Sequence, residues 1–178
     1  MARHIVLLRG INIGSRNRIA MPELRKVLEA AGFDDVRTYV QSGNVVLSSG
    51  KSAAEVARAC ERQITTSFGL DIDVIVRTRA QLAKVVERNP LAEVATEPKR
   101  YQVSFLSGKP SAEVMRKLED AAAAEERVVL AGREIYAWHP EGIVRSRLWT
   151  LLAGRGVGVT ATARNWTTVT TLLELASS

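Results

Sequence analysis

Tyr39 to Leu47 read YVQSGNVVL, and this stretch decides the fold of the first half of the chain. Valines lie on both sides of Ser42-Gly43, which is the pattern of two strands joined by a tight turn. The stretch therefore predicts a β-hairpin.

The elements around this hairpin complete a recognisable order. The short apolar run His4 to Arg9 predicts a buried strand, and Asp71 to Arg77 predicts a second one. Apolar residues at helical spacing predict one helix from Pro22 to Gly32 and another from the cap at Ser52 to Gly69. The order strand, helix, hairpin, helix, strand is ferredoxin-like.

The second half repeats this opening. Tyr101 to Leu106 predicts a strand, Ser111 begins a helix, and Arg127 to Trp138 predicts a hairpin that turns near Gly132. Two further helices follow, and the last is an amphipathic segment with Trp166. We therefore expect an α+β protein of two ferredoxin-like α/β halves, residues 1–90 and 99–178, joined by a linker at 91–98.

Composition limits the class of protein. The chain has 178 residues, of which 46% are hydrophobic and 25% charged, as in an ordinary globular protein. It has neither the ~18 continuous apolar residues of a membrane span nor a signal peptide. We expect a cytoplasmic protein with no membrane partner. Because it has one cysteine, Cys60, and two histidines, we also expect no metal and no cofactor.

Positive charge gathers at the N-terminal end. The formal net charge is +6 and the pI is about 9.9. Met1 to Pro22 contains four arginines and no acidic residue. This excess favours an anionic small molecule or nucleic acid as partner. The competing interpretation is a solvated basic surface that binds nothing.

The segment Arg9 to Arg18, RGINIGSRNR, is the strongest candidate for a ligand-binding site. A loop between a strand and a helix, with two glycines and three arginines, can offer backbone N–H groups beside fixed positive charge. It lacks the spacing of a Walker A loop or a dinucleotide fingerprint. Alternatively, Gly10 and Gly14 supply only the backbone conformations that a turn needs.

Three other segments carry polar donors. The first is Arg145-Ser146-Arg147 at a predicted helix start, and the second is Thr162 to Trp166 (TARNW), whose tryptophan could stack on a ring. The third is the hairpin tip at Gln41 to Asn44. Each also has a structural interpretation, as a helix cap, a packed core residue or a tight turn. The candidate ligand-binding residues are Arg9, Gly10, Asn12, Gly14, Arg16, Asn17, Gln41, Ser42, Asn44, Arg145, Ser146, Arg147, Arg164, Asn165 and Trp166.

The sequence offers few side chains for acid–base catalysis. Neither His4 nor His139 has a carboxylate partner that the sequence identifies, and Cys60 lies on the apolar face of a predicted helix. Three hypotheses therefore stay open: a module that binds an anionic ligand, an enzyme acting on a small anionic substrate, and a structural or homo-oligomeric protein. The first is favoured because convergent charge is visible, whereas a residue for proton transfer is not.

The segments RGINIGSRNRIAMPELR, TYVQSGNVV, GREIY, RSRL and TARNWTTV resemble the family named domain of unknown function 1697. The resemblance implies a cytoplasmic bacterial protein with two ferredoxin-like halves and supplies no catalytic assignment. Where the family usually has glycine and two lysines, this chain has Ser15, Arg16 and Arg147. Because arginine keeps its proton near neutral pH, these positions exclude lysine chemistry.

Overall fold

The computed structural model describes all residues, 1–178, and the chain divides into two compact units. Unit 1 comprises Met1–Lys84 and Thr171–Ser178, and unit 2 comprises Val85–Thr170. The divisions fall within α3 (Arg79–Arg88) and α6 (Trp166–Ser177). The linker expected at 91–98 stays a prediction, because a division into compact units does not establish which segments fold independently.

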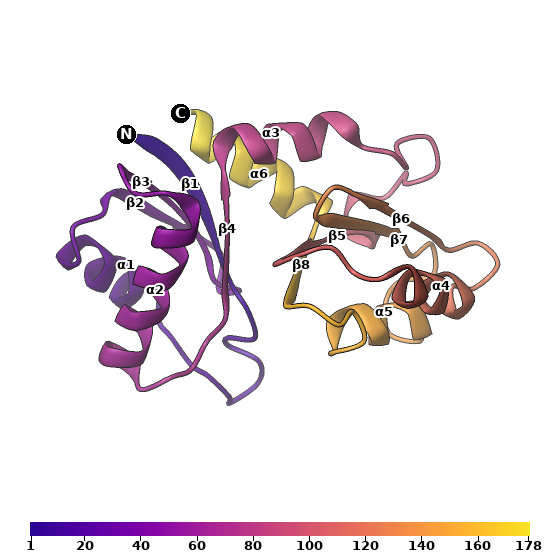
Figure 1. Cartoon of the computed structure of the whole chain (residues 1–178), viewed down its shortest axis with the longest axis horizontal. Helices are drawn as coiled ribbons and strands as arrows, with labels where there is room; N and C mark the ends of the chain where they lie inside the picture. Colours follow the sequence, from indigo (N-terminus) through magenta and orange to yellow (C-terminus); the bar gives the residue numbers. More distant parts are fainter. The chain divides into compact units, whose positions relative to one another are not determined.

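Unit 1 contains a four-stranded antiparallel sheet in the order β2-β3-β1-β4. The strands are β1 (Ala2–Leu8), β2 (Asp34–Tyr39), β3 (Asn44–Ser49) and β4 (Val74–Thr78). The helices α1 (Met21–Ala30) and α2 (Ala53–Phe68) lie on one face of this sheet (Figure 1). The hairpin expected from YVQSGNVVL is confirmed as β2 and β3.

The core of unit 1 lies between the sheet and these two helices. Alternate strand residues such as Val6, Leu47 and Val76 pack against helix residues such as Leu24 and Ile64. Because side chains alternate across a strand and recur every three or four residues on a helix, the two apolar faces meet. The expected core position of Cys60 is confirmed.

The predicted ends of α2 are also confirmed. The Ser52 hydroxyl oxygen accepts a hydrogen bond from the Glu55 N–H at 3.2 Å, as expected of an N-cap. Gly69 ends the helix in the left-handed conformation, with φ at 67°.

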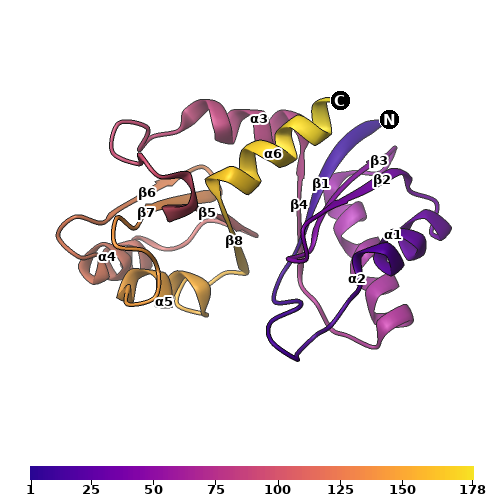
Figure 2. The same cartoon turned by 180° about the vertical axis from the view of Figure 1, so that it is seen from behind.

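Unit 2 contains a second four-stranded antiparallel sheet, in the equivalent order β6-β7-β5-β8. Its strands are β5 (Tyr101–Leu106), β6 (Arg127–Ala131), β7 (Glu134–Trp138) and β8 (Ala161–Asn165), and the short 3-10 helix η1 (Pro98–Arg100) precedes β5. The helices α4 (Ala112–Ala121) and α5 (Arg147–Ala153) lie on one face (Figure 2). The two sheets confirm the expected α+β class with two ferredoxin-like halves.

One strand of unit 2 lies outside the sequence-based expectation. The segment ATARN, which forms β8, was expected only as part of the region between a glycine-rich turn and the last helix. It has small residues and a buried Arg164 where a strand usually has large apolar side chains. Separately, no helix of the chain is long and apolar enough to cross a bilayer.

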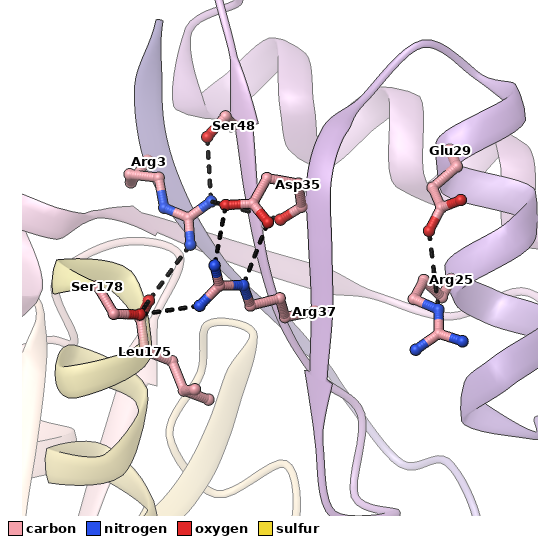
Figure 3. Close-up of polar contacts among 8 residues, drawn as sticks. All are labelled: Arg3, Arg25, Glu29, Asp35, Arg37, Ser48, Leu175 and Ser178. Carbon is pink, nitrogen blue, oxygen red and sulfur yellow. Dashed lines mark hydrogen bonds and ion pairs between the residues drawn. The ribbon is translucent and has the colours of Figure 1, made fainter.

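An arginine on β1 ties the end of α6 to the sheet of unit 1 (Figure 3). The Arg3 Nη1 donates to Asp35 Oδ2 at 2.8 Å and to the Ser48 hydroxyl at 3.1 Å, and Nη2 donates to the Leu175 carbonyl at 3.2 Å. Arg37 adds a bond of 2.8 Å to the Ser178 hydroxyl. Positive charge at this position also stabilises α6, because the C-terminal end of a helix carries a partial negative charge.

We expect Arg3→Ala to lower the free energy of unfolding by about 1–2 kcal/mol, because one half-buried guanidinium holds three partners. Arg25→Ala is the matched control, since Arg25 makes one exposed contact of 3.7 Å to Glu29 (Figure 3) and should change stability by less than about 0.5 kcal/mol. Urea denaturation of both variants measures the difference. Equal effects would contradict the role given to Arg3.

Candidate functional site

The loop between β1 and α1 is held by the side chain of Asn12. The Asn12 Nδ2 donates to the Ile19 carbonyl at 2.9 Å and to the Gln41 carbonyl at 2.7 Å, while Oδ1 accepts from the Ile19 N–H at 2.8 Å. One amide therefore joins both ends of the loop to the β2–β3 turn. Residues 10–18 and the hairpin tip, predicted separately from the sequence, are brought together within unit 1.

The tip of the loop is a tight turn. The Arg16 N–H donates to the Ile13 carbonyl at 3.0 Å, with Gly14 at φ 58° and Ser15 outside the positive region. Positive φ at only the first central residue is typical of a type II′ turn, which favours glycine there. Asn17 braces the base by donating from Nδ2 to the Gly10 carbonyl at 2.9 Å.

The hairpin tip is equally constrained. A Cβ added to Gly43, whose φ is 84°, would lie 2.8 Å from the Leu8 Cβ, so only glycine fits. The buried Asn44 donates from Nδ2 to the Tyr39 carbonyl at 3.0 Å and to the Ser42 hydroxyl at 2.9 Å. Val40 has φ at 50°, which is strained for a β-branched residue. The motif Gln-Ser-Gly-Asn therefore has a structural role in its own turn.

The groups that the loop presents outward are positive. The side chains of Arg16 and Arg18 are exposed, and Arg18 Nη1 donates to the Gly14 carbonyl at 3.0 Å. Arg16 has no carboxylate within ion-pair distance, and the N–H groups of Gly14 and Ser15 have no acceptor within the protein. Free N–H groups beside guanidinium groups can hold an anion.

The Arg-Asn-Trp segment at the start of α6 is engaged inside unit 2. The Arg164 Nη1 donates to the Thr162 hydroxyl at 2.7 Å and to the Ala163 carbonyl at 2.9 Å, and burial lowers the pKa of Arg164 to about 10. Asn165 Oδ1 accepts from the Thr168 N–H, and Trp166 stacks on Tyr101 with ring centroids 4.8 Å apart. These contacts match the structural interpretation of the segment.

The segment Arg145 to Arg147 adjoins a buried cluster that the sequence did not identify. The Ser146 hydroxyl donates to Glu126 Oε2 at 2.6 Å, and its oxygen accepts from the Trp149 N–H at 3.0 Å, as a helix cap does. His139 Nδ1 lies 2.6 Å from the same Glu126 Oε2, and the Ala123 N–H donates to Oε1 at 2.9 Å. Glu126 and His139 are both buried.

This cluster does not have the geometry of a hydrolytic triad. In a triad the carboxylate and the serine contact opposite ring nitrogens of the histidine. Here Ser146 Oγ and Glu126 Oε2 both lie against His139 Nδ1, at 3.3 and 2.6 Å, while Nε2 is buried without a hydrogen bond. The arrangement cannot pass the serine proton to Nε2. It stabilises the approach to α5.

The pair could have been found from the hairpin register. Arg127 pairs with Trp138, so Glu126 and His139 form the next pair outward. Extending the predicted hairpin by one residue on each side would have placed the carboxylate beside the imidazole. The strand register of the hairpin, and no sequence motif, indicates that Glu126 and His139 are neighbours.

Other reactive side chains are withdrawn from solvent. Burial raises the pKa of the Cys60 thiol to about 12, which leaves little thiolate for nucleophilic attack. Burial lowers the pKa of His4, which lies inside the unit 1 sheet. No group of three or more His, Cys, Asp and Glu side chains is arranged to hold a metal ion.

A family model described as protein of unknown function (DUF1697) matches residues 1–136. The chain belongs to the DUF1697 family. The match includes the loop at Gly10 to Arg18, the hairpin tip and Glu126, whereas Arg145 to Arg147 and Arg164 to Trp166 lie beyond it.

A solved structure shares the fold of this DUF1697 member. The conserved bacterial protein SP0830 from Streptococcus pneumoniae is 22% identical, with a TM-score of 0.81 over 98% of each chain. At this identity the likeness shows the fold alone. Among curated proteins, none matches the chain.

The Glu126 cluster predicts a specific pH dependence. Burial alone would raise the pKa of Glu126, but hydrogen bonds from the Ala123 N–H, Ser146 and His139 more than offset it, and the pKa is lowered. A lowered folded-state pKa stabilises the fold above the unfolded value of about 4.3, and this stability is lost as pH falls through the folded pKa.

We therefore expect Glu126→Gln to lower the free energy of unfolding at pH 7 by about 1–3 kcal/mol and to flatten its fall between about pH 5 and 3. Glu125→Gln, at the exposed neighbouring position, should change neither quantity. Denaturant unfolding at several pH values measures both. If the free energy of unfolding of Glu126→Gln fell between about pH 5 and 3 as steeply as that of the wild type, Glu126 would not be the source of this pH dependence.

Proposed function

We propose that this protein binds a phosphorylated or otherwise anionic ligand at the loop from Gly10 to Arg18. The observation that carries the proposal is the exposed tip of this loop. There the exposed side chains of Arg16 and Arg18 follow closely in sequence after Gly14 and Ser15, whose N–H groups have no acceptor within the protein.

The conformation of the loop supports the proposal, because a rigid site loses little entropy when a ligand binds. Asn12 and Asn17 satisfy the backbone at both ends of the loop, and neither depends on a ligand. We give these asparagines a positioning role. The ligand contacts fall to the arginines and to the N–H groups at the tip.

The local charge supports the proposal as well. The first 22 residues contain no carboxylate. Asp73, whose carbonyl accepts from the Arg9 N–H at 3.0 Å, lies at the base of the loop and not at its tip. An anion approaching the tip therefore meets guanidinium groups first.

The open position of the tip suits a phosphate group on a small molecule or on a nucleic acid backbone. The residues from Gly10 to Arg18 include no aromatic side chain on which a base could stack. Nucleic acid binding here would thus rest on phosphate contacts and would depend steeply on salt. The buried Arg164 and the stacked Trp166 have no part in this proposal.

Fluorescence anisotropy of a labelled single-stranded RNA, a DNA duplex and a labelled mononucleotide, at two salt concentrations, tests the proposal. We expect Arg16→Ala/Arg18→Ala to bind about tenfold more weakly, since each exposed charge contact contributes about 0.2–1 kcal/mol. Arg116→Ala/Arg155→Ala is the control, because it removes the same charge from exposed positions in unit 2.

Each outcome has a distinct meaning. Salt-sensitive binding of the polymers that only the loop variant loses would support a nucleic acid partner, whereas loss of mononucleotide binding alone would support a small phosphorylated ligand. Equal losses in the loop variant and the control, or no binding of any probe by the wild type, would overturn the proposal. The structural interpretation of the loop would then hold.

A further inference from the structure

A pocket in unit 2 lies outside the function proposed above. Its volume is about 840 Å³, and it lies between the segment that ends α4 and precedes β6, residues 120–126, and the segment that leads into α5, residues 140–147. This is within the size range of pockets that hold small molecules.

The wall of this pocket carries a fixed negative charge. Glu126 lines it and is 8% exposed. Its Oε2 accepts from Ser146 and His139, and its Oε1 accepts from the Ala123 N–H. Because a carboxylate offers about four lone pairs, these three donors leave about one on Oε1 for a further donor.

The charged side chains around the pocket include both signs. The acidic residues outnumber the basic ones by four to two, which gives a formal charge of −2: Asp120, Glu125, Glu126 and Glu141 against Arg145 and Arg147. A ligand with only negative charge would face the carboxylates. A ligand that carries both positive and negative groups, with a net positive charge, is complementary to the charges of the pocket.

Most of the uncharged lining is apolar. Four successive alanines, Ala121 to Ala124, form part of the wall, and Val144 at the other side is 94% exposed. These small apolar groups can contact a methylene chain. The pocket therefore combines apolar surface with charged groups of both signs.

We propose that this pocket binds an amino acid with a basic side chain, or a close analogue with two ammonium groups and one carboxylate. Glu126 receives an ammonium group, Arg145 and Arg147 receive the carboxylate, and the methylene chain contacts Ala121 to Ala124. The proposal concerns a different unit and a ligand of opposite net charge from the loop at Gly10 to Arg18, so either proposal can fail without the other.

Isothermal titration with three probes tests this inference. L-lysine carries both signs, 1,5-diaminopentane lacks the carboxylate, and L-glutamate has the opposite net charge. We expect saturable binding that is tightest for L-lysine, weaker for the diamine and weakest for L-glutamate. Binding of L-glutamate as tight as that of L-lysine would overturn the proposal, as would the absence of saturable L-lysine binding.

Three variants locate the ligand. Ala124→Trp, at an exposed lining position, should place an indole ring over the alanine wall and weaken L-lysine binding by at least about tenfold. Arg145→Ala/Arg147→Ala should weaken L-lysine about fivefold but should not weaken the diamine, since only the carboxylate contact is lost. Arg116→Ala, on α4 but outside the lining, should change neither. Unaltered L-lysine binding in Ala124→Trp would contradict the site.

Discussion

The amide of Asn12 is the constraint on which the candidate site in unit 1 depends. Its three hydrogen bonds join Asn12 to Ile19, across the loop, and to the turn between β2 and β3. Without them the loop would keep only the bonds of its own tip and base, and it would lose its side-chain connection to the β2–β3 turn. The order of the sheet supplies the rest, because β3 pairs directly with β1 and brings the hairpin tip to the loop.

Local patterns were sufficient to predict most of the fold. The hairpin at Ser42-Gly43, the cap at Ser52, the stop at Gly69 and the strand from Tyr101 to Leu106 each depend on neighbouring residues, and all are confirmed. β8 was not predicted because its residues are small or polar, and the sheet partner that selects its conformation, β5, lies about sixty residues earlier. Tertiary pairing, not propensity, forms this strand.

The candidate site was predictable in composition but not in geometry. The sequence indicates that Gly10 to Arg18 is a basic loop with two glycines, yet the bond from Asn12 to Gln41 spans 29 residues and leaves no local pattern. The burial of Arg164 contradicts the usual exposure of arginine and could not be inferred from its neighbours. Glu126 and His139 show the opposite case, since the predicted hairpin, extended by one pair, would have placed them together.

Amide NMR during titration with inorganic pyrophosphate shows whether the preformed loop binds an anion. We expect saturable shifts of the Gly14, Ser15 and Arg16 amides in the wild type. We also expect at least about tenfold weaker binding in Asn12→Ala, whose unit 2 amides should keep their wild-type positions. Saturable shifts confined to other residues, no saturable shift at all, or wild-type affinity in Asn12→Ala would show that the loop held by Asn12 is not an anion site.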